Sequence, residues 1–389
     1  MQLSERMEPV VAEGPRNPGL LIRVLTDPFS LRPCNLADWD FLLSQARHCR
    51  LLPRLACLAE QAGIIQELPR EVRPHLLTGR TIAAQHARLT RWEVNRLEQC
   101  LRGTSIPIAL LKGAAYLIAG LPPARGRLCS DVDILVPRSS LDAIESLLRS
   151  AGYQDLDLDR YDQRYYRTWM HELPPLRHRD RTTPVDVHHN ILPLTGRLHP
   201  NADALFAAAL PVAGSIFRVL APADMVLHSA AHFFQDGDLA GGLRDLIDMD
   251  DLLRHFGREQ DFWQSLVPRA QTMDLARPLY YALRYTKRIL GTPIPDPVMA
   301  AAEASRPAPP VLFLMDFCTG RALAAPHPDD MPSRLSALAA WCLYVRSHWL
   351  RMPPQLLAQH LTRKAFRRWI ERWKRRREEQ DIQHAKRDN

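Results

Sequence analysis

The stretch RGRLCSDVDILV, residues 125–136, decides the fold of this chain. Successive side chains of a strand point to opposite faces, so Asp131 and Asp133 project from one face and the intervening valine from the other. Two ionised carboxylates side by side repel each other, which makes them a poor structural pair and a natural site for a divalent cation that also contacts phosphate oxygens. The pattern therefore predicts metal-assisted chemistry on a phosphate group, as in nucleotidyl transfer.

The sequence before this stretch predicts a strand, a turn and a helix. The apolar run IPIALL at residues 106–111 has the length of a strand and ends at Lys112 and Gly113. We expect a helix over residues 114–119, followed by a loop over residues 120–126 that contains two consecutive prolines. This loop leads into the strand that carries the acidic pair.

A third carboxylate lies further along the chain. Residues 164–192 predict two extended segments around a polar turn at residues 178–184. In the second segment Asp186 and His188 share a face, because they are two residues apart. If this strand pairs beside residues 131–136, all three aspartates converge in the arrangement that two-metal phosphoryl transfer needs.

Helical patterns dominate on both sides of this region, and Asn35 is suited to cap the first of the long helices. We therefore predict an α+β (mixed α/β) fold with a small mixed sheet flanked by helical segments. Helical spacing of apolar residues covers residues 36–46, 78–101, 139–148, 202–210, 223–234 and 243–256. The expected parts are a loosely ordered arm (1–34), a helical N-terminal segment (35–102), a catalytic core (103–220), a helical C-terminal domain (221–361) and a basic amphipathic tail (362–389).

Length and composition describe a chain with ample material for a buried core, because 46% of its 389 residues are hydrophobic. The seven cysteines are scattered and show neither a Cys-x-x-Cys zinc motif nor a disulfide framework, so we expect free thiols in a reducing cytoplasm. No secretory leader pattern and no run of about 20 apolar residues is present. We therefore expect a cytoplasmic protein without a transmembrane segment.

The net charge of +8 is mostly a property of the tail. Residues 362–389 hold eleven Lys/Arg against five Asp/Glu, so the rest of the chain carries only about +2. Within the tail, Phe366, Trp369, Ile370 and Trp373 form an apolar stripe among basic residues. One interpretation is a helix that docks this stripe on the body of the protein. The other two are a helix that contacts anionic lipid and a helix that contacts RNA.

Taken together, the Lys-Gly turn, the arginine at 127, the Asp-x-Asp pair and the later Asp-x-His resemble the bacterial uncharacterised nucleotidyltransferase branch of the DNA polymerase β-like nucleotidyltransferase superfamily. Downstream, HSAAH at 228–232 and LRDLID at 243–248 resemble the helical His and Arg-x-x-x-Asp elements of that branch. The resemblance extends over about residues 80 to 260. One departure is Gly113-Ala114, where the superfamily usually has Gly-Gly or Gly-Ser, so the hydroxyl that often contacts a phosphate is missing.

The resemblance implies a Mg²⁺-dependent, polymerase-β-like enzyme that uses a nucleoside triphosphate (NTP). Asp131 and Asp133 would hold Mg²⁺, and Asp186 would complete a two-metal site and help to deprotonate the acceptor hydroxyl. The expected nucleotide-binding residues are Lys112, Gly113, Ala114, Arg127 and Ser130, and the candidate substrate contacts are His188, His228, His232, Arg244 and Asp248.

Structural interpretations stay open for several of these residues. The acidic pair could lie on a solvated edge strand, and Lys112 and Arg127 could be surface charges or partners of acidic ligands. His228 and His232 are four residues apart, a spacing also found in metal sites, but the missing glutamate of a His-Glu-x-x-His motif argues against a zinc hydrolase. Packing is the alternative for both histidines.

The acceptor stays open among small molecules, proteins and RNA, and the modest charge outside the tail favours the first two. Two other functions remain: a catalytically inactive nucleotide-binding regulator, and a peripheral scaffold that acts through its basic tail. The three clustered aspartates argue against the first of these.

Overall fold

The described chain contains a seven-stranded mixed sheet with the strand order β3-β4-β5-β2-β1-β7-β6. The computed structural model describes residues 19–156, 170–236, 239, 242–324, 331, 333–351 and 353. The strands are β1 (Ile108–Leu110), β2 (Val132–Leu135), β3 (Tyr153–Asp155), β4 (Leu176–His178), β5 (Pro184–His188), β6 (Leu210–Pro211) and β7 (Phe217–Val219). The predicted α+β fold with a small mixed sheet is therefore confirmed.

The acidic strand β2 lies inside the sheet. It pairs in parallel with β5 and antiparallel with β1. Val132 and Ile134 have no exposed surface, and Asp133 is only 5% exposed. The alternative of a solvated edge strand is therefore wrong, because the apolar face of β2 is part of the core and its acidic face is covered.

Helices account for most of the remaining described chain. The long helices begin and end close to the predicted positions, and Asn35 forms a capping box in which its side chain accepts from Asp38 N while the Asp38 side chain accepts from Asn35 N. The α-helices are α1 (Leu20–Thr26), α2 (Leu36–His48), α3 (Leu52–Gln61), α4 (Arg73–Leu101), α5 (Lys112–Ile118), α6 (Leu141–Ser150), α8 (Ala202–Ala208), α9 (Pro222–Asp236), α10 (Leu243–Phe256), α11 (Gln260–Thr272), α12 (Ala276–Tyr285), α13 (Asp296–Ala302), α14 (Pro309–Ala322) and α15 (Arg334–Arg351). Short 3₁₀ turns are η1 (Pro28–Leu31), η2 (Ile65–Glu67), η3 (Pro122–Ala124), η4 (Arg138–Ser140) and η6 (Glu303–Ser305), and η5 (Thr286–Leu290) is a π-helical turn.

The segment before residue 35 differs from the loosely ordered arm that we predicted. Over its described part, α1 and η1 are helical, and Leu21, Val24 and Leu31 are completely buried. Prolines and glycines recur in this segment, but these leucine and valine side chains are enough to attach it to the core.

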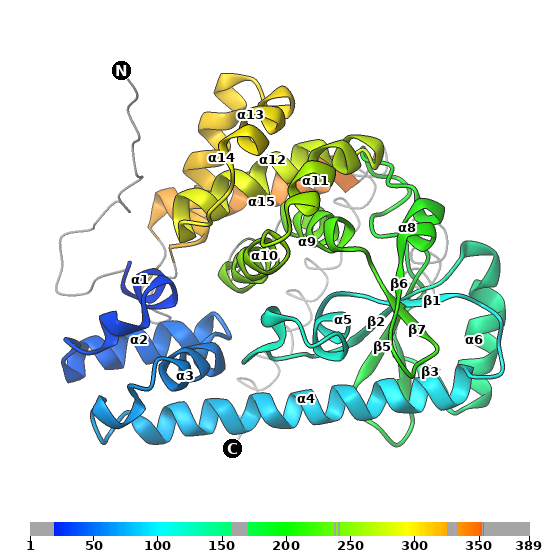
Figure 1. Ribbon diagram of the computed structural model, residues 1–389, viewed down its shortest axis with the longest axis horizontal. Coiled ribbons are helices and arrows are strands. Elements are labelled where there is room, and N and C mark those ends of the chain that lie inside the picture. The colour runs from blue at the N-terminus through cyan, green and yellow to red at the C-terminus, as the bar shows by residue number, and fades with distance from the viewer. Residues whose placement is uncertain are drawn as a thin grey trace, which may run out of the picture.

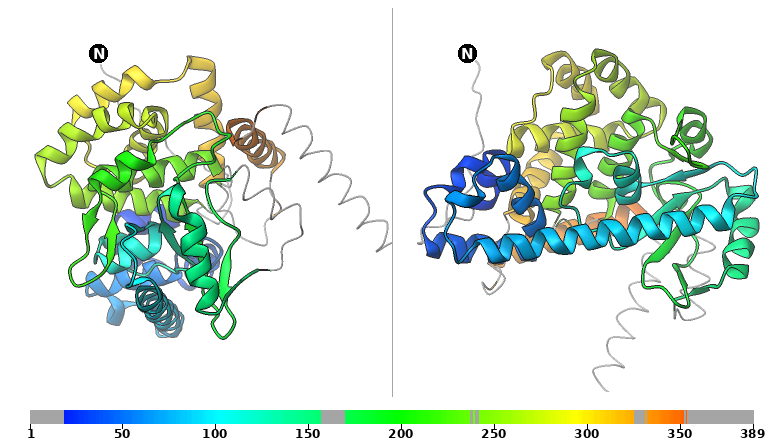
Figure 2. Two further views of the ribbon diagram at one scale, coloured as in Figure 1. Left: turned by 90° about the vertical axis from the view of Figure 1, so that its right-hand side faces the viewer. Right: turned by 60° about the horizontal axis from the view of Figure 1, so that its bottom comes forward.

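Helix α4 links the two ends of the molecule (Figure 1). It runs from the N-terminal helices α1–α3 to the sheet, while the helices from α9 onward gather on the other side of the molecule. The two further views show the same arrangement, with α4 along one border (Figure 2). Helix α5 and strand β2 both contact α4, so the acidic strand lies between α4 and the later helices.

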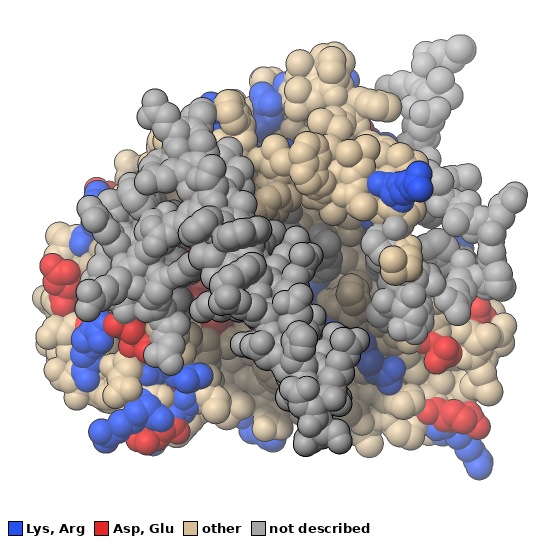
Figure 3. Space-filling view, turned by 180° about the vertical axis from the view of Figure 1, so that it is seen from behind, with Lys and Arg blue, Asp and Glu red and all other residues tan. Residues whose placement is uncertain are grey.

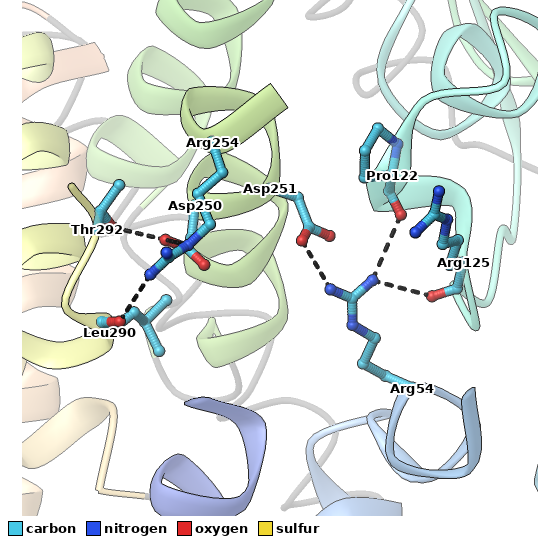
Figure 4. A network of polar contacts seen from close by, with 8 residues as sticks. All are labelled: Arg54, Pro122, Arg125, Asp250, Asp251, Arg254, Leu290 and Thr292. Atoms are coloured by element: carbon cyan, nitrogen blue, oxygen red, sulfur yellow. Dashed lines mark hydrogen bonds and ion pairs between the residues drawn. The ribbon is translucent and has the colours of Figure 1, made fainter. Parts of the chain in front are cut away.

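A polar network joins the N-terminal helices to the loop that precedes β2 (Figure 4). Arg54 on α3 donates to the carbonyl oxygens of Pro122 and Arg125 and to Asp251 on α10, the last at 2.7 Å. Gly126 has φ +68°, and a Cβ there would lie 2.7 Å from the backbone of residues 53 and 54. The loop that leads to the acidic pair is therefore held against the first turn of α3, and Arg54 links it to α10.

Two expectations about the rest of the chain have different outcomes. Among the described residues, none of the helices combines the length and the apolar character that crossing a membrane requires. The predicted amphipathic tail at 362–389 lies outside the described residues.

Candidate active site

The pairing of β2 with β5 brings the predicted carboxylates together. In this parallel register Asp133 and Asp186 are direct partners, and Asp131 immediately precedes β2. All three interact electrostatically with one another. The convergence that the sequence predicted for paired strands is therefore present.

The environment of Asp186 disfavours its charged form. Burial and the neighbouring Asp133 raise the pKa of Asp186 to about 7. Its Oδ1 atom is buried and has no hydrogen-bond partner among the described residues. Burial and Asp133 also raise the pKa of Asp131. For Asp131 the cations of Lys112 and Arg127 and a hydrogen bond with Ser130 act in the opposite direction but do not outweigh burial and Asp133, so two of the three aspartates have raised pKa values.

Asp133 is the exception, because two basic side chains hold it. Burial opposes its ionisation, but the Lys112 ammonium and the His188 ring lower its pKa below the usual aspartate range. Lys112 Nζ lies 3.8 Å from Asp133 Oδ1, and His188 Nε2 lies 2.9 Å from the same oxygen. Asp133 is therefore the fixed anion of the cluster, and its negative charge suppresses ionisation of its two neighbours.

Lys112 stands at a strained turn between β1 and α5. Its φ of +44° is in the left-handed region, where a residue with a Cβ costs about 1 kcal/mol or more. The preceding residue, Leu111, is extended and donates its N–H to Asp133 O at 3.0 Å. The turn therefore places the lysine beside the acidic strand at the expense of local strain.

Arg127 forms its direct ion pair with α10, and its positive charge also acts on Asp131 in the aspartate cluster. Its Nε donates to Asp248 Oδ2 at 2.8 Å, and its side chain is only 11% exposed. A Cβ at Gly113 would lie 2.8 Å from Arg127 Nη1 and 3.0 Å from Cys129 Sγ. The structure thus gives Gly113 a packing reason and makes Arg127 a partner of an acidic side chain, which was one of the two predicted interpretations.

The other predicted residues lie around this centre. His188 is 3% exposed, and His228 on α9 is 4% exposed, with a pKa well below its usual value because of burial and the nearby Lys112 cation. Arg244 pairs with its neighbour Asp245 at 2.8 Å. His232 is half-buried on α9, Ser130 is exposed, and Ala114 is buried in α5.

Sequence reasoning missed two residues beside the centre, His171 and Glu172. They precede β4 and run antiparallel to β5, where Glu172 forms a bridge opposite His188. Glu172 Oε2 lies 3.2 Å from His188 Nδ1, and the rings of His171 and His188 lie 5.2 Å apart. The adjacent His-Glu pair within the predicted extended segment was the available signal.

The aspartate cluster fits a hard divalent cation. Its donors are carboxylate oxygens, which Mg²⁺ prefers, and Asp186 offers a buried oxygen without a hydrogen-bond partner among the described residues. Asp131, Asp133 and Asp186 are the residues that would hold such an ion.

The fold and the site are those of a nucleotidyltransferase. A strained basic turn follows β1, an acidic pair lies at the start of β2, and a third carboxylate lies on the parallel strand β5. The family described as "Uncharacterised nucleotidyltransferase" matches residues 35–291, more than half of the chain, and the chain belongs to this family. Comparison with curated proteins and with solved structures gave no match. The predicted family is therefore confirmed.

Proposed function

We propose that this protein is a Mg²⁺-dependent nucleotidyltransferase that transfers a nucleoside monophosphate from an NTP to a hydroxyl group and releases pyrophosphate. The observation that carries the proposal is the register pairing of Asp133 with Asp186, which leaves a buried carboxylate oxygen of Asp186 without a hydrogen-bond partner in the described structure. Structural carboxylates of this burial are normally paired with a cation or a hydrogen-bond donor. A site that receives its cation together with the substrate accounts for the exception.

The aspartates have distinct roles in this proposal. Asp131, Asp133 and Asp186 would hold Mg²⁺, and the bound ion would neutralise charge on the triphosphate and favour loss of the acceptor proton. Asp186 would also accept the proton of the acceptor hydroxyl. The new bond joins the acceptor oxygen to the α-phosphorus, and the bond from that phosphorus to the pyrophosphate oxygen breaks.

Basic residues near the aspartates complete the site. Lys112, next to Asp133, provides a cation for the phosphates of the NTP. His188 holds Asp133 in position through its Nε2 atom. Arg127 and Asp248 have an indirect role, because their hydrogen bond fixes the segment before β2 against α10.

A small molecule or a protein fits the acceptor role better than a long nucleic acid. On the face seen in Figure 3, acidic and basic side chains of the described residues are interspersed around the border, and the visible upper part is mainly uncharged. Binding of a nucleic-acid backbone uses many lysines and arginines gathered on one surface. The basic tail, which is the strongest argument for RNA or lipid, lies outside the described residues.

The alternatives are an inactive nucleotide-binding regulator and a scaffold that acts through the tail. Three mutually repelling carboxylates cost stability, and neither alternative requires all of them. Deletion of the residues after Leu361 separates the scaffold from the enzyme, because nucleotide transfer survives the deletion if the tail only localises the protein.

Calorimetry with ATP, GTP, CTP and UTP in the presence of Mg²⁺ tests the proposal. We expect metal-dependent binding of at least one NTP, and loss of that binding in the Asp131→Asn/Asp133→Asn double variant. Asp142→Asn, an exposed substitution on α6, is the matched control. Equal binding by the double variant, or no binding at millimolar NTP, contradicts the proposal. If one NTP binds as expected, its α-labelled form serves to search for the acceptor.

A further inference from the structure

Three side chains beside the aspartate cluster form a second, chemically different donor set. His171, Glu172 and His188 each offer one ligand atom, and these atoms all lie within 4.8 Å of one another. Two nitrogens and one carboxylate oxygen suit Zn²⁺ and similar transition metals, whereas the oxygen donors of the aspartates suit Mg²⁺.

The backbone holds these donors in place. His189 N donates to His171 O at 2.8 Å, and Leu173 N donates to Val187 O at 2.8 Å. Between these two hydrogen bonds, Glu172 lies directly opposite His188 in an antiparallel bridge. Side chains of directly opposed residues project from the same face, so the glutamate and the histidine meet because of the register.

The tautomer of His188 leaves one nitrogen for a ligand. Nε2 lies 2.9 Å from Asp133 Oδ1, and an ionised carboxylate only accepts hydrogen bonds, so Nε2 carries the proton. When this ring, which is 3% exposed, is neutral, its Nδ1 presents a lone pair. It has no hydrogen-bond partner among the described residues, although Glu172 Oε2 lies only 3.2 Å away. A cation between these two atoms is therefore favoured, and either a proton on Nδ1 or a metal ion supplies it.

The spacing agrees with shared coordination. Two ligand atoms bound at about 2.1 Å to one tetrahedral ion lie roughly 3.4 Å apart, close to the 3.2 Å between His188 Nδ1 and Glu172 Oε2. His171 needs only a small movement to complete the set, because its ring centroid is 5.2 Å from that of His188. A histidine that binds a metal through one nitrogen commonly donates from the other to a carboxylate, which is how His188 contacts Asp133.

We propose that His171, Glu172 and His188 bind one divalent transition metal ion of the Zn²⁺ type, with the fourth position open to water. This ion fixes the His188 tautomer and so positions Asp133 in the neighbouring site. The inference does not depend on nucleotidyl transfer, because it follows from these three residues and their contact with Asp133.

Cobalt substitution tests the proposal on the full chain. Protein that has been treated with a chelator is titrated with Co²⁺ and followed by the visible bands of cobalt in a site with nitrogen ligands. We expect saturation at one equivalent, with competition by Zn²⁺. His171→Ala and Glu172→Gln each raise the dissociation constant at least about tenfold.

Two controls separate this site from other binding. His48→Ala removes an exposed imidazole on α2 and leaves the titration unchanged. Asp131→Asn removes a carboxylate of the aspartate cluster and also leaves it unchanged. Thermal denaturation of each variant without metal establishes that it is folded. Absence of the bands, equal binding by Glu172→Gln, or loss of binding only in Asp131→Asn overturns the proposal, and none of these outcomes decides whether NTP binds.

Discussion

Asp186 on β5 and Asp316 on α14 are both partly buried aspartates, yet their surroundings are opposite. Asp316 accepts from Arg284 at 2.9 and 2.6 Å, from Arg288 at 2.9 Å and from Tyr285 at 3.0 Å. Burial opposes its ionisation, but these donors lower its pKa. The pKa of Asp186 is raised to about 7 by burial and by another carboxylate.

This difference separates a carboxylate that stabilises the fold from one that destabilises it. A buried acidic group surrounded by donors contributes to stability, whereas an acidic group surrounded by like charges lowers stability until a cation arrives. Perturbed pKa values of the second kind gather at functional sites. The contrast can be tested by making the same substitution at both positions.

The largest expected effect is on activity at the aspartate cluster. Asp133→Asn and Asp186→Asn each lower kcat/KM for pyrophosphate release by at least about 1,000-fold, or about 4 kcal/mol, because both remove a metal ligand. Asp316→Asn changes kcat/KM less than about threefold, since it removes no group near the cluster. Activity of Asp186→Asn within tenfold of the unsubstituted protein would remove Asp186 from the proposed mechanism.

The surroundings of Asp186 could be predicted from the sequence to a greater extent than those of Asp316. The strand alternation placed Asp131 and Asp133 on one face, and the pairing with Asp186 needed only that two predicted strands be neighbours. The partners of Asp316 lie on helix α12 and on the π-helical turn η5 that follows it, so no local sequence pattern predicts these contacts. Local periodicity predicts faces, but long-range helix packing decides contacts.

The same limit explains why the sequence left some contacts of the site open and missed others. Arg127 and Asp248 are 121 residues apart, so their hydrogen bond has no signature in spacing. Glu172 meets His188 through an antiparallel bridge whose register a polar turn does not specify. The sequence therefore predicted the carboxylates better than the groups that surround them.

The second largest effect is a loss of stability at Asp316. Asp316→Ala lowers the free energy of unfolding by about 2 kcal/mol at pH 7, because two partly buried arginines lose their anion. The folded pKa is below the unfolded value of about 3.9, so the contribution is present above that pH and disappears as the pH falls through the lowered pKa. Urea denaturation at pH 7 and pH 3 measures the difference, and an equal loss at both values contradicts the electrostatic explanation.

A smaller effect of opposite sign is expected at Asp186. Its folded pKa of about 7 is above the unfolded value of about 3.9, so the folded protein binds the extra proton and stability falls as the pH rises from about 4 to about 7. Asp186→Asn removes this slope and raises the free energy of unfolding of metal-free protein at pH 8 by about 1–2 kcal/mol. Added Mg²⁺ stabilises the unsubstituted protein and has less effect on the variant.

Denaturation in chelator at pH 5 and pH 8 checks the sign for Asp186. A variant that is less stable than the unsubstituted protein at pH 8 would place Asp186 in the same class as Asp316. The contrast between the two carboxylates would then fail, whatever the activity measurements give.

The smallest expected effect tests whether the crowding at the cluster extends to α5. Gly113→Ala places a Cβ 2.8 Å from Arg127 Nη1 and 3.0 Å from Cys129 Sγ, and the guanidinium is tied to Asp248 and cannot move freely. We expect a loss of about 1–2 kcal/mol. Gly103→Ala is the matched control, because nothing lies within 4 Å of its added Cβ. If both variants unfold at the same temperature, Arg127 adjusts easily, and its contact with Asp248 is too loose to fix the segment that leads to the acidic strand.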